Sequence, residues 1–103
     1  MPEERGAEWG GLPIVRKLGD LHNRTRVEVT AQIIAAGQSR IFGVRAFICQ
    51  IDDGTGQISL AFTGRATIPG LSVGTRCRVE GTAQERDGRL IILNPGYEIE
   101  ASL

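Results

Sequence analysis

The 103-residue chain has few histidines and cysteines, on which zinc sites and disulfide scaffolds depend, and it has no long apolar run of the kind that crosses a membrane. It has one His and two Cys, and no Cys or His pair stands at metal-ligand spacing, so neither a metal site nor a cofactor is expected. The longest mostly apolar stretch without a charge, about residues 31–37, is far shorter than the roughly 20 residues that cross a bilayer. No basic and then apolar leader opens the sequence, so the cytoplasm is the expected compartment, with no membrane partner.

Neither charge sign is in excess, because 12 basic side chains balance 12 acidic ones. The balance is uneven along the chain: residues 16–97 hold 11 basic and seven acidic side chains, a net charge of +4, between acidic ends. Lys17 is the single lysine, and the other basic residues are arginines. A moderately basic body between acidic ends is compatible with a polyanionic partner.

Glycine, in contrast, is abundant, with 14 residues, and two of the glycine turns are nearly alike. Asp53-Gly54-Thr55-Gly56 and Asp87-Gly88 each lie between runs of alternating apolar and polar residues. An Asp-Gly pair in that setting predicts a tight hairpin between two antiparallel strands. The alternation predicts strands at about 26–38, 44–52, 57–63, 75–85 and 89–93, a loop at 38–43, a helical turn at 18–21 and further pairing at 97–99.

Pro69 interrupts the alternation, because proline removes a ladder donor and restricts its neighbour. Residues 64–74 are therefore expected to form a loop or a short helix between the third and fourth strands. Five strands with their long connection at that place favour an all-β, five-stranded Greek-key barrel of the oligonucleotide/oligosaccharide-binding (OB) type over an SH3-like barrel. We expect one OB domain over residues 13–103, preceded by a flexible acidic lead-in, residues 1–12.

Particular stretches also resemble known OB domains. Residues 51–60, Ile-Asp-Asp-Gly-Thr-Gly-Gln-Ile-Ser-Leu, resemble the second hairpin of nucleic-acid-binding OB domains of the tRNA-anticodon type. Residues 87–98 are similar to the end of the wedge domain of the branched-DNA helicase RecG, and Asp20-Leu21 with Val27-Glu28-Val29 resembles its start. The chain is also similar to small stand-alone OB proteins of actinobacteria. It departs from the RecG pattern at Thr63 and Asn94, and it has no Gly-Lys phosphate loop, which excludes helicase activity.

OB domains bind ligands on the face of the second and third strands, between the loops that join strands one to two and four to five. The outward positions there are expected to be Ile48, Gln50, Ser59, Ala61 and Thr63, whereas Phe47, Phe62, Cys49 and Cys77 share the parity of the core. Arginines along such a groove pair with phosphates and release counterions. The expected nucleic-acid site consists of Arg40, Phe42, Gln50, Ser59, Thr63, Arg65, Arg86 and Arg89.

The favoured function is non-enzymatic binding of single-stranded or branched nucleic acid, DNA or RNA. Two alternatives remain: an OB module that docks a protein partner in DNA or RNA metabolism without nucleic-acid affinity of its own, and arginines that only solvate the surface. An enzyme is not expected. Gly70-Leu71-Ser72-Val73-Gly74 matches a nucleophile elbow but has no helix predicted after it. Asp52 and Asp53 are strand neighbours, whose side chains point to opposite faces.

Overall fold

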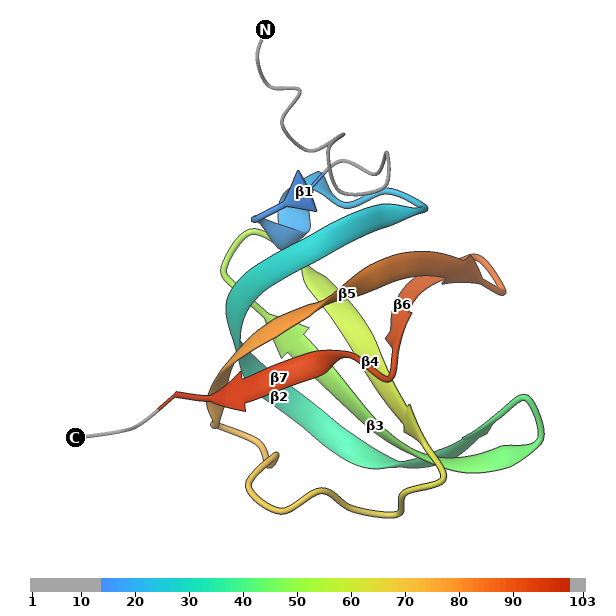
Figure 1. Ribbon diagram of the computed structural model, residues 1–103. Helices are drawn as coiled ribbons and strands as arrows, with labels where there is room; N and C mark the ends of the chain where they lie inside the picture. The colour runs from blue at the N-terminus through green and yellow to red at the C-terminus, as the bar shows by residue number, and fades with distance from the viewer. Residues whose placement is uncertain (1–13, 101–103) are drawn as a thin grey trace, which may run out of the picture.

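The computed structural model describes residues 14–100, and the predicted lead-in, residues 1–12, lies outside them. The described chain consists mostly of strands (Figure 1). No helix in this part of the chain has the length and hydropathy needed to cross a membrane. The elements are β1 (Ile14–Val15), the 3-10 helix η2 (Leu18–Asp20), β2 (Thr25–Ile41), β3 (Val44–Asp52), β4 (Gln57–Thr63), β5 (Arg76–Arg86), β6 (Arg89–Leu93) and β7 (Gly96–Ile99).

Five of the strands pair in a closed ring, in the order β2, β3, β4, β6, β5 and back to β2 (Figure 1). The long strand β2 makes closure possible, because residues 25–32 pair with β5 and residues 32–41 pair with β3. A β-bulge between Ile33 and Ala35 lies just after the strand changes partner. The parallel pairing of β4 with β6 supplies the remaining seam. The molecule is therefore the all-β, five-stranded Greek-key OB barrel that the sequence predicts.

Turn chemistry and alternation predicted most of the strand boundaries. Strands β3, β4 and β6 have the predicted limits, β5 is shifted by one residue, and β7 includes the predicted pairing segment. The connection at 64–75 is a loop without a helix, and it buries Ile68 and Leu71 against the core. The short strand β1, which pairs in parallel with β2, was not predicted.

The prediction that residues 38–43 form a loop is wrong. Strand β2 continues to Ile41, and the connection to β3 is the two-residue turn Phe42-Gly43. Both turn residues have positive φ angles, 54° and 76°, as a primed hairpin turn requires. The β2–β3 hairpin is consequently longer than expected and extends past the paired end of β4.

The core contains the side chains that alternation places inward. Val27, Val29, Phe47 and Phe62 are all buried. Cys49 and Cys77 are buried and unbonded. Burial raises the pKa of the Cys49 thiol to about 11, with a further contribution from Cys77, and burial also raises the pKa of Cys77. Both cysteines therefore behave as small apolar core residues.

The Asp53 turn joins the β3–β4 hairpin to η2. One carboxylate oxygen of Asp53 accepts a hydrogen bond from the Leu18 N–H at 2.9 Å, and the other accepts bonds from Thr55 and Gly56. Burial by itself would raise the pKa of Asp53. The hydrogen bonds favour the charged form and outweigh burial, so the pKa of Asp53 lies below its ordinary value. Asp52 instead accepts bonds from Gly54 and Gln57, so the two carboxylates do not converge on one point.

Candidate functional site

A groove of about 630 Å³ lies between the β2–β3 hairpin and the β5–β6 hairpin. Ile48, Gln50 and Ser59 of β3 and β4 contribute to its floor. Residues 35–39 and Ile41 line the β2 side, and residues 86, 87 and 89–91 line the side of the second hairpin. Figure 1 shows the tips of these two hairpins on the same side of the barrel. The groove thus lies where OB domains bind their ligands.

The two hairpin tips meet through a cation–π contact. The guanidinium carbon of Arg86 lies 3.7 Å from the centre of the Phe42 ring. Each residue lies in or beside a primed turn, Phe42-Gly43 and Asp87-Gly88, in which both turn residues have positive φ angles. The turns therefore bring an aromatic ring and an arginine together at the edge of the groove, although the two residues are far apart in the sequence.

Phe42 is an unusual residue for its position. A non-glycine residue in the left-handed region costs about 1–2 kcal/mol, and asparagine or aspartate normally takes this place in the turn. Phe42 is also 61% exposed, so burial does not compensate for that cost. The chain thus holds a largely solvent-exposed aromatic ring in a strained turn beside the groove, which is typical of a functional position.

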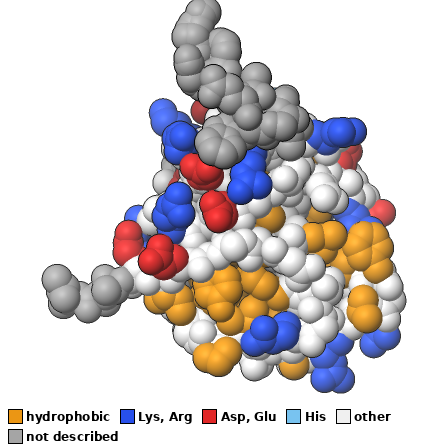
Figure 2. Space-filling view, in the orientation of Figure 1, with side chains coloured by type: hydrophobic (Ala, Val, Ile, Leu, Met, Phe, Trp, Pro, Cys, Tyr) orange, Lys and Arg blue, Asp and Glu red, His pale blue; other side chains and the backbone are white. Residues whose placement is uncertain are grey.

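The arginines divide into two sets by their partners. Four arginines on and around the outer faces of β2 and β5 form ion pairs with glutamates: Arg16 and Arg78 with Glu28, Arg26 with Glu80, and Arg76 with Glu100. No described carboxylate forms an ion pair with Arg24, Arg40, Arg45, Arg65, Arg86 or Arg89, and of these Arg24 lies away from the groove, beside Thr82 and Gln84. Figure 2 shows acidic and basic side chains intermixed at the upper left, and basic side chains without acidic neighbours along the lower edge. The second set is therefore available to an anionic ligand.

The structure brings Phe42, Gln50, Ser59, Arg86 and Arg89 together at the groove. Gln50 donates a hydrogen bond to the Gln57 side chain at 3.0 Å, and Gln57 in turn donates to Asp52, so the Gln50 amide is oriented. Arg89 of β6 lies directly opposite Arg86 of β5 in the register of the hairpin. The two cationic side chains therefore lie on the same face of that hairpin.

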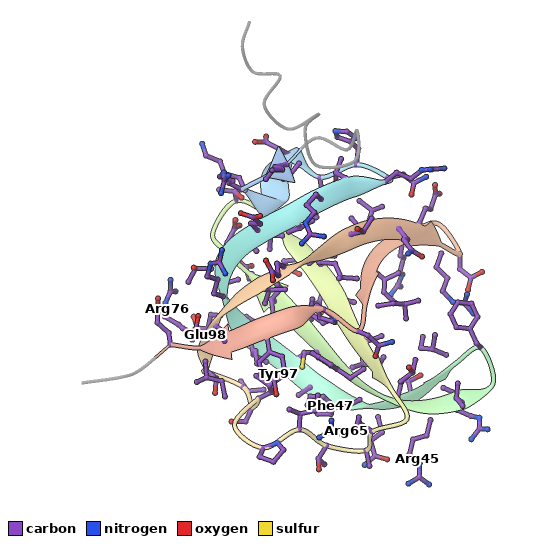
Figure 3. The ribbon with its side chains drawn as sticks, in the orientation of Figure 1. Arg45, Phe47, Arg65, Arg76, Tyr97 and Glu98 are labelled. Carbon is purple, nitrogen blue, oxygen red and sulfur yellow. The ribbon has the colours of Figure 1, made fainter. Side chains whose placement is uncertain are left out.

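Four predicted site residues are not part of the groove lining: Phe42, which reaches the groove only through its contact with Arg86, and Arg40, Thr63 and Arg65. Arg40 is opposite Arg45, on the face to which Phe47 points, and its guanidinium donates to the Gly43 carbonyl. Thr63 is held by Asn94, whose side-chain oxygen accepts the Thr63 N–H at 3.0 Å. Arg65 lies beyond the end of β4, near Arg45 (Figure 3). Ala61, expected to face outward, is fully buried.

Several groove residues were missed from the sequence. Asp87, Leu90 and Ile91 line the wall beside Arg89, and Gly37 and Ser39 line the opposite wall. Gly37 has nothing within 4 Å of where a Cβ would stand, so the β2 wall is open at this point. A run of small residues, Ala-Ala-Gly at 35–37, was the available signal. A strand edge without bulky side chains lets a ligand approach the backbone closely.

Comparisons with known proteins agree with the architecture. The chain is similar to the OB domain of a protein from Methanosarcina mazei, solved by NMR in solution, with a TM-score of 0.64 and 16% sequence identity. The similarity covers 87% of this chain and 85% of that domain. No protein-family model and no curated protein matches the chain. At this identity the likeness shows the fold, and the chain is an OB domain by fold.

Proposed function

We propose that the protein binds single-stranded or branched nucleic acid in the groove, without catalysing a reaction on it. The observation that carries the proposal is the joint placement of Phe42, Arg86 and Arg89 beside the oriented Gln50 amide. Neither arginine has an ion pair among residues 14–100, so binding a phosphate breaks no existing pair there. A cationic groove beside an exposed aromatic ring is typical of proteins that bind single strands.

Each group has a distinct part in this proposal. Arg86 and Arg89 pair with phosphates, because a guanidinium matches the geometry of phosphate oxygens. The exposed Phe42 ring stacks on a base, an interaction worth about 1–3 kcal/mol in single-strand binders. The Gln50 amide bonds to base edges. Because one ring and two phosphate-binding arginines carry most of the affinity, we expect weak, salt-sensitive binding with little sequence preference.

Fluorescence anisotropy with labelled single-stranded DNA, single-stranded RNA and a DNA fork tests the proposal. We expect log K to fall linearly with log salt concentration. The double variant Arg86→Ala/Arg89→Ala should bind every sequence more weakly and reduce the slope for a single strand by roughly 1.4, or about 0.7 for each phosphate that is no longer neutralised. The loss of affinity should be similar for all sequences, because phosphate contacts carry no base information.

The matched control is Arg16→Ala/Arg78→Ala, which removes the same charge from arginines paired with Glu28. This control should leave the salt slope nearly unchanged. Equal losses of affinity in the two double variants would show that net charge, not the groove, attracts the ligand. Affinity weaker than millimolar for all three nucleic acids at low salt would instead favour the protein-interaction module.

A further inference from the structure

Strand β7 lies outside the closed ring and has one open edge. Within the described residues it pairs only with β5. The Glu100 N–H donates to the Arg76 carbonyl at 2.9 Å, and in this register Arg78 lies opposite Glu98. Hydrogen-bonded pairs alternate along an antiparallel ladder, so the N–H and C=O groups of Tyr97 and Ile99 face away from β5. These backbone groups are available to another strand.

The side chains of the same two residues form an apolar surface below this edge. Tyr97 lies opposite Val79 and Ile99 opposite Cys77, so both side chains point to the face of β5 that holds the core. Each is nevertheless 42% exposed. The Tyr97 ring meets the buried Phe62 ring edge-on, with centroids 5.7 Å apart. Figure 2 shows hydrophobic side chains gathered below β7, and we call the surface formed by Tyr97 and Ile99 the Tyr97 patch.

The loop at 64–75 fits against the other end of this patch. A Cβ atom on Gly70 would collide with Cδ1 of Ile99, so a glycine at this position lets Ile99 lie on the loop. Ile68 and Leu71 of the same loop are buried in the core cluster. The loop and Phe62 therefore support the patch from below. Contacts within the fold, and not a partner, hold Tyr97 and Ile99 in place.

Basic side chains border the patch on the side away from β7. Figure 3 shows Arg65 and Arg45 below Tyr97 and Phe47. Neither arginine forms an ion pair with a described carboxylate. Glu98 lies opposite Arg78, so its side chain is on the other face of the sheet from Tyr97. A ligand on the patch therefore meets apolar and basic groups, and the matching ligand is apolar and acidic.

We propose that β7 and the Tyr97 patch form a docking site for an extended, acidic and apolar segment of a partner protein. The segment adds a strand to the open edge of β7. Every second side chain of the segment then points to the face that holds the Tyr97 patch. Apolar side chains pack on Tyr97 and Ile99, and an acidic side chain beside them reaches Arg65. A nucleic acid fits less well, because only Tyr97 of the two patch residues is aromatic and the open strand edge matches another strand.

Anisotropy of a fluorescein-labelled peptide, Glu-Thr-Ile-Thr-Val-Thr-Glu, tests the site in the full chain. Its inward side chains would be Glu, Ile, Val and Glu, with neutral Thr on the outer face. We expect at least fivefold weaker binding when both Glu residues are replaced by Lys. The same loss of affinity is expected from Arg65→Glu and a larger one from Ile99→Glu, with folding of each variant checked by circular dichroism.

Two controls separate this site from the groove. Lys17→Glu reverses a charge beside β1, at the opposite end of the molecule from the loop, and should leave peptide affinity unchanged (Figure 1). Arg86→Ala/Arg89→Ala should also leave it unchanged, whatever that variant does to nucleic-acid binding. The proposal is overturned if the two peptides bind equally, or if the Arg86/Arg89 variant loses the peptide. It also fails if Arg65→Glu weakens oligonucleotide binding and leaves peptide binding unchanged.

Discussion

Replacing Phe42 by asparagine should weaken binding without a loss of stability. Phe42 has a φ angle of 54° in a primed turn, where a non-glycine side chain costs about 1–2 kcal/mol and asparagine is the usual occupant. The variant also removes the ring that lies 3.7 Å from the Arg86 guanidinium, a cation–π interaction worth about 0.5–1 kcal/mol at an exposed site. Subtracting the second range from the first leaves about 0–1.5 kcal/mol, so the variant should be at least as stable to unfolding as the wild type.

The same change removes the aromatic ring from the groove. Without one base-stacking interaction, about 1–3 kcal/mol, a single strand should bind roughly 5- to 150-fold more weakly. Urea unfolding measures the first effect and oligonucleotide anisotropy the second. Phe42→Tyr is the matched control, because it keeps the ring and the strain, and both quantities should stay near those of the wild type. Unchanged affinity in Phe42→Asn, or a clear decrease in stability, would refute this role for the residue.

Three further predictions concern the fold. Asp53→Asn should destabilise the protein by about 1–3 kcal/mol at pH 7, because the turn loses a charged acceptor. Since the folded-state pKa of Asp53 lies below its ordinary value, its stabilisation is present above that ordinary value and is lost as pH falls through the lowered pKa. Urea unfolding from pH 7 to pH 2.5 should therefore show a shallower acid dependence in the variant, and equal dependence would contradict the assignment. Gly56→Ala should lower the melting temperature, because the new Cβ would stand 2.9 Å from the Leu18 backbone, whereas Gly37→Ala, with nothing within 4 Å, should not. Finally, Cys49 and Cys77 should react with a thiol reagent only after unfolding, since burial raises both pKa values; fast reaction of the native protein would disprove this.

The parts of the fold predicted correctly are those specified by local chemistry. Asp53-Gly54 and Asp87-Gly88 mark turns by residue type, and period-two alternation fixes the strands on either side. The two-residue strand β1 has too few residues to show a period, and its pairing with β2 depends on tertiary contacts. The Phe42-Gly43 turn was missed because phenylalanine is not a usual turn residue, and the polar end of β2 resembles a loop.

The lining of the groove was predicted in part, because some of its residues lie beside a turn that the sequence locates. Arg86 and Arg89 follow from the Asp87-Gly88 turn, which the sequence locates, whereas Phe42 was placed in a loop at 38–43 that is in fact the end of β2 and a two-residue turn. The side of the hairpin on which Arg40 lies depends on the bulge between Ile33 and Ala35. One extra residue in a strand reverses the faces of all later residues, and no residue type in this stretch marks the bulge. Arg65 lies in the loop after β4, where alternation makes no prediction.

The most direct test of nucleic-acid binding in the groove is amide chemical-shift mapping during titration with a thymidine hexamer. We predict the largest shifts at the groove, among Phe42, Ile48, Gln50 and the Arg86–Arg89 turn, with small shifts on the ion-paired outer face of β5. The largest shifts on the outer face of β5, or small shifts spread evenly over the barrel, would contradict binding in the groove.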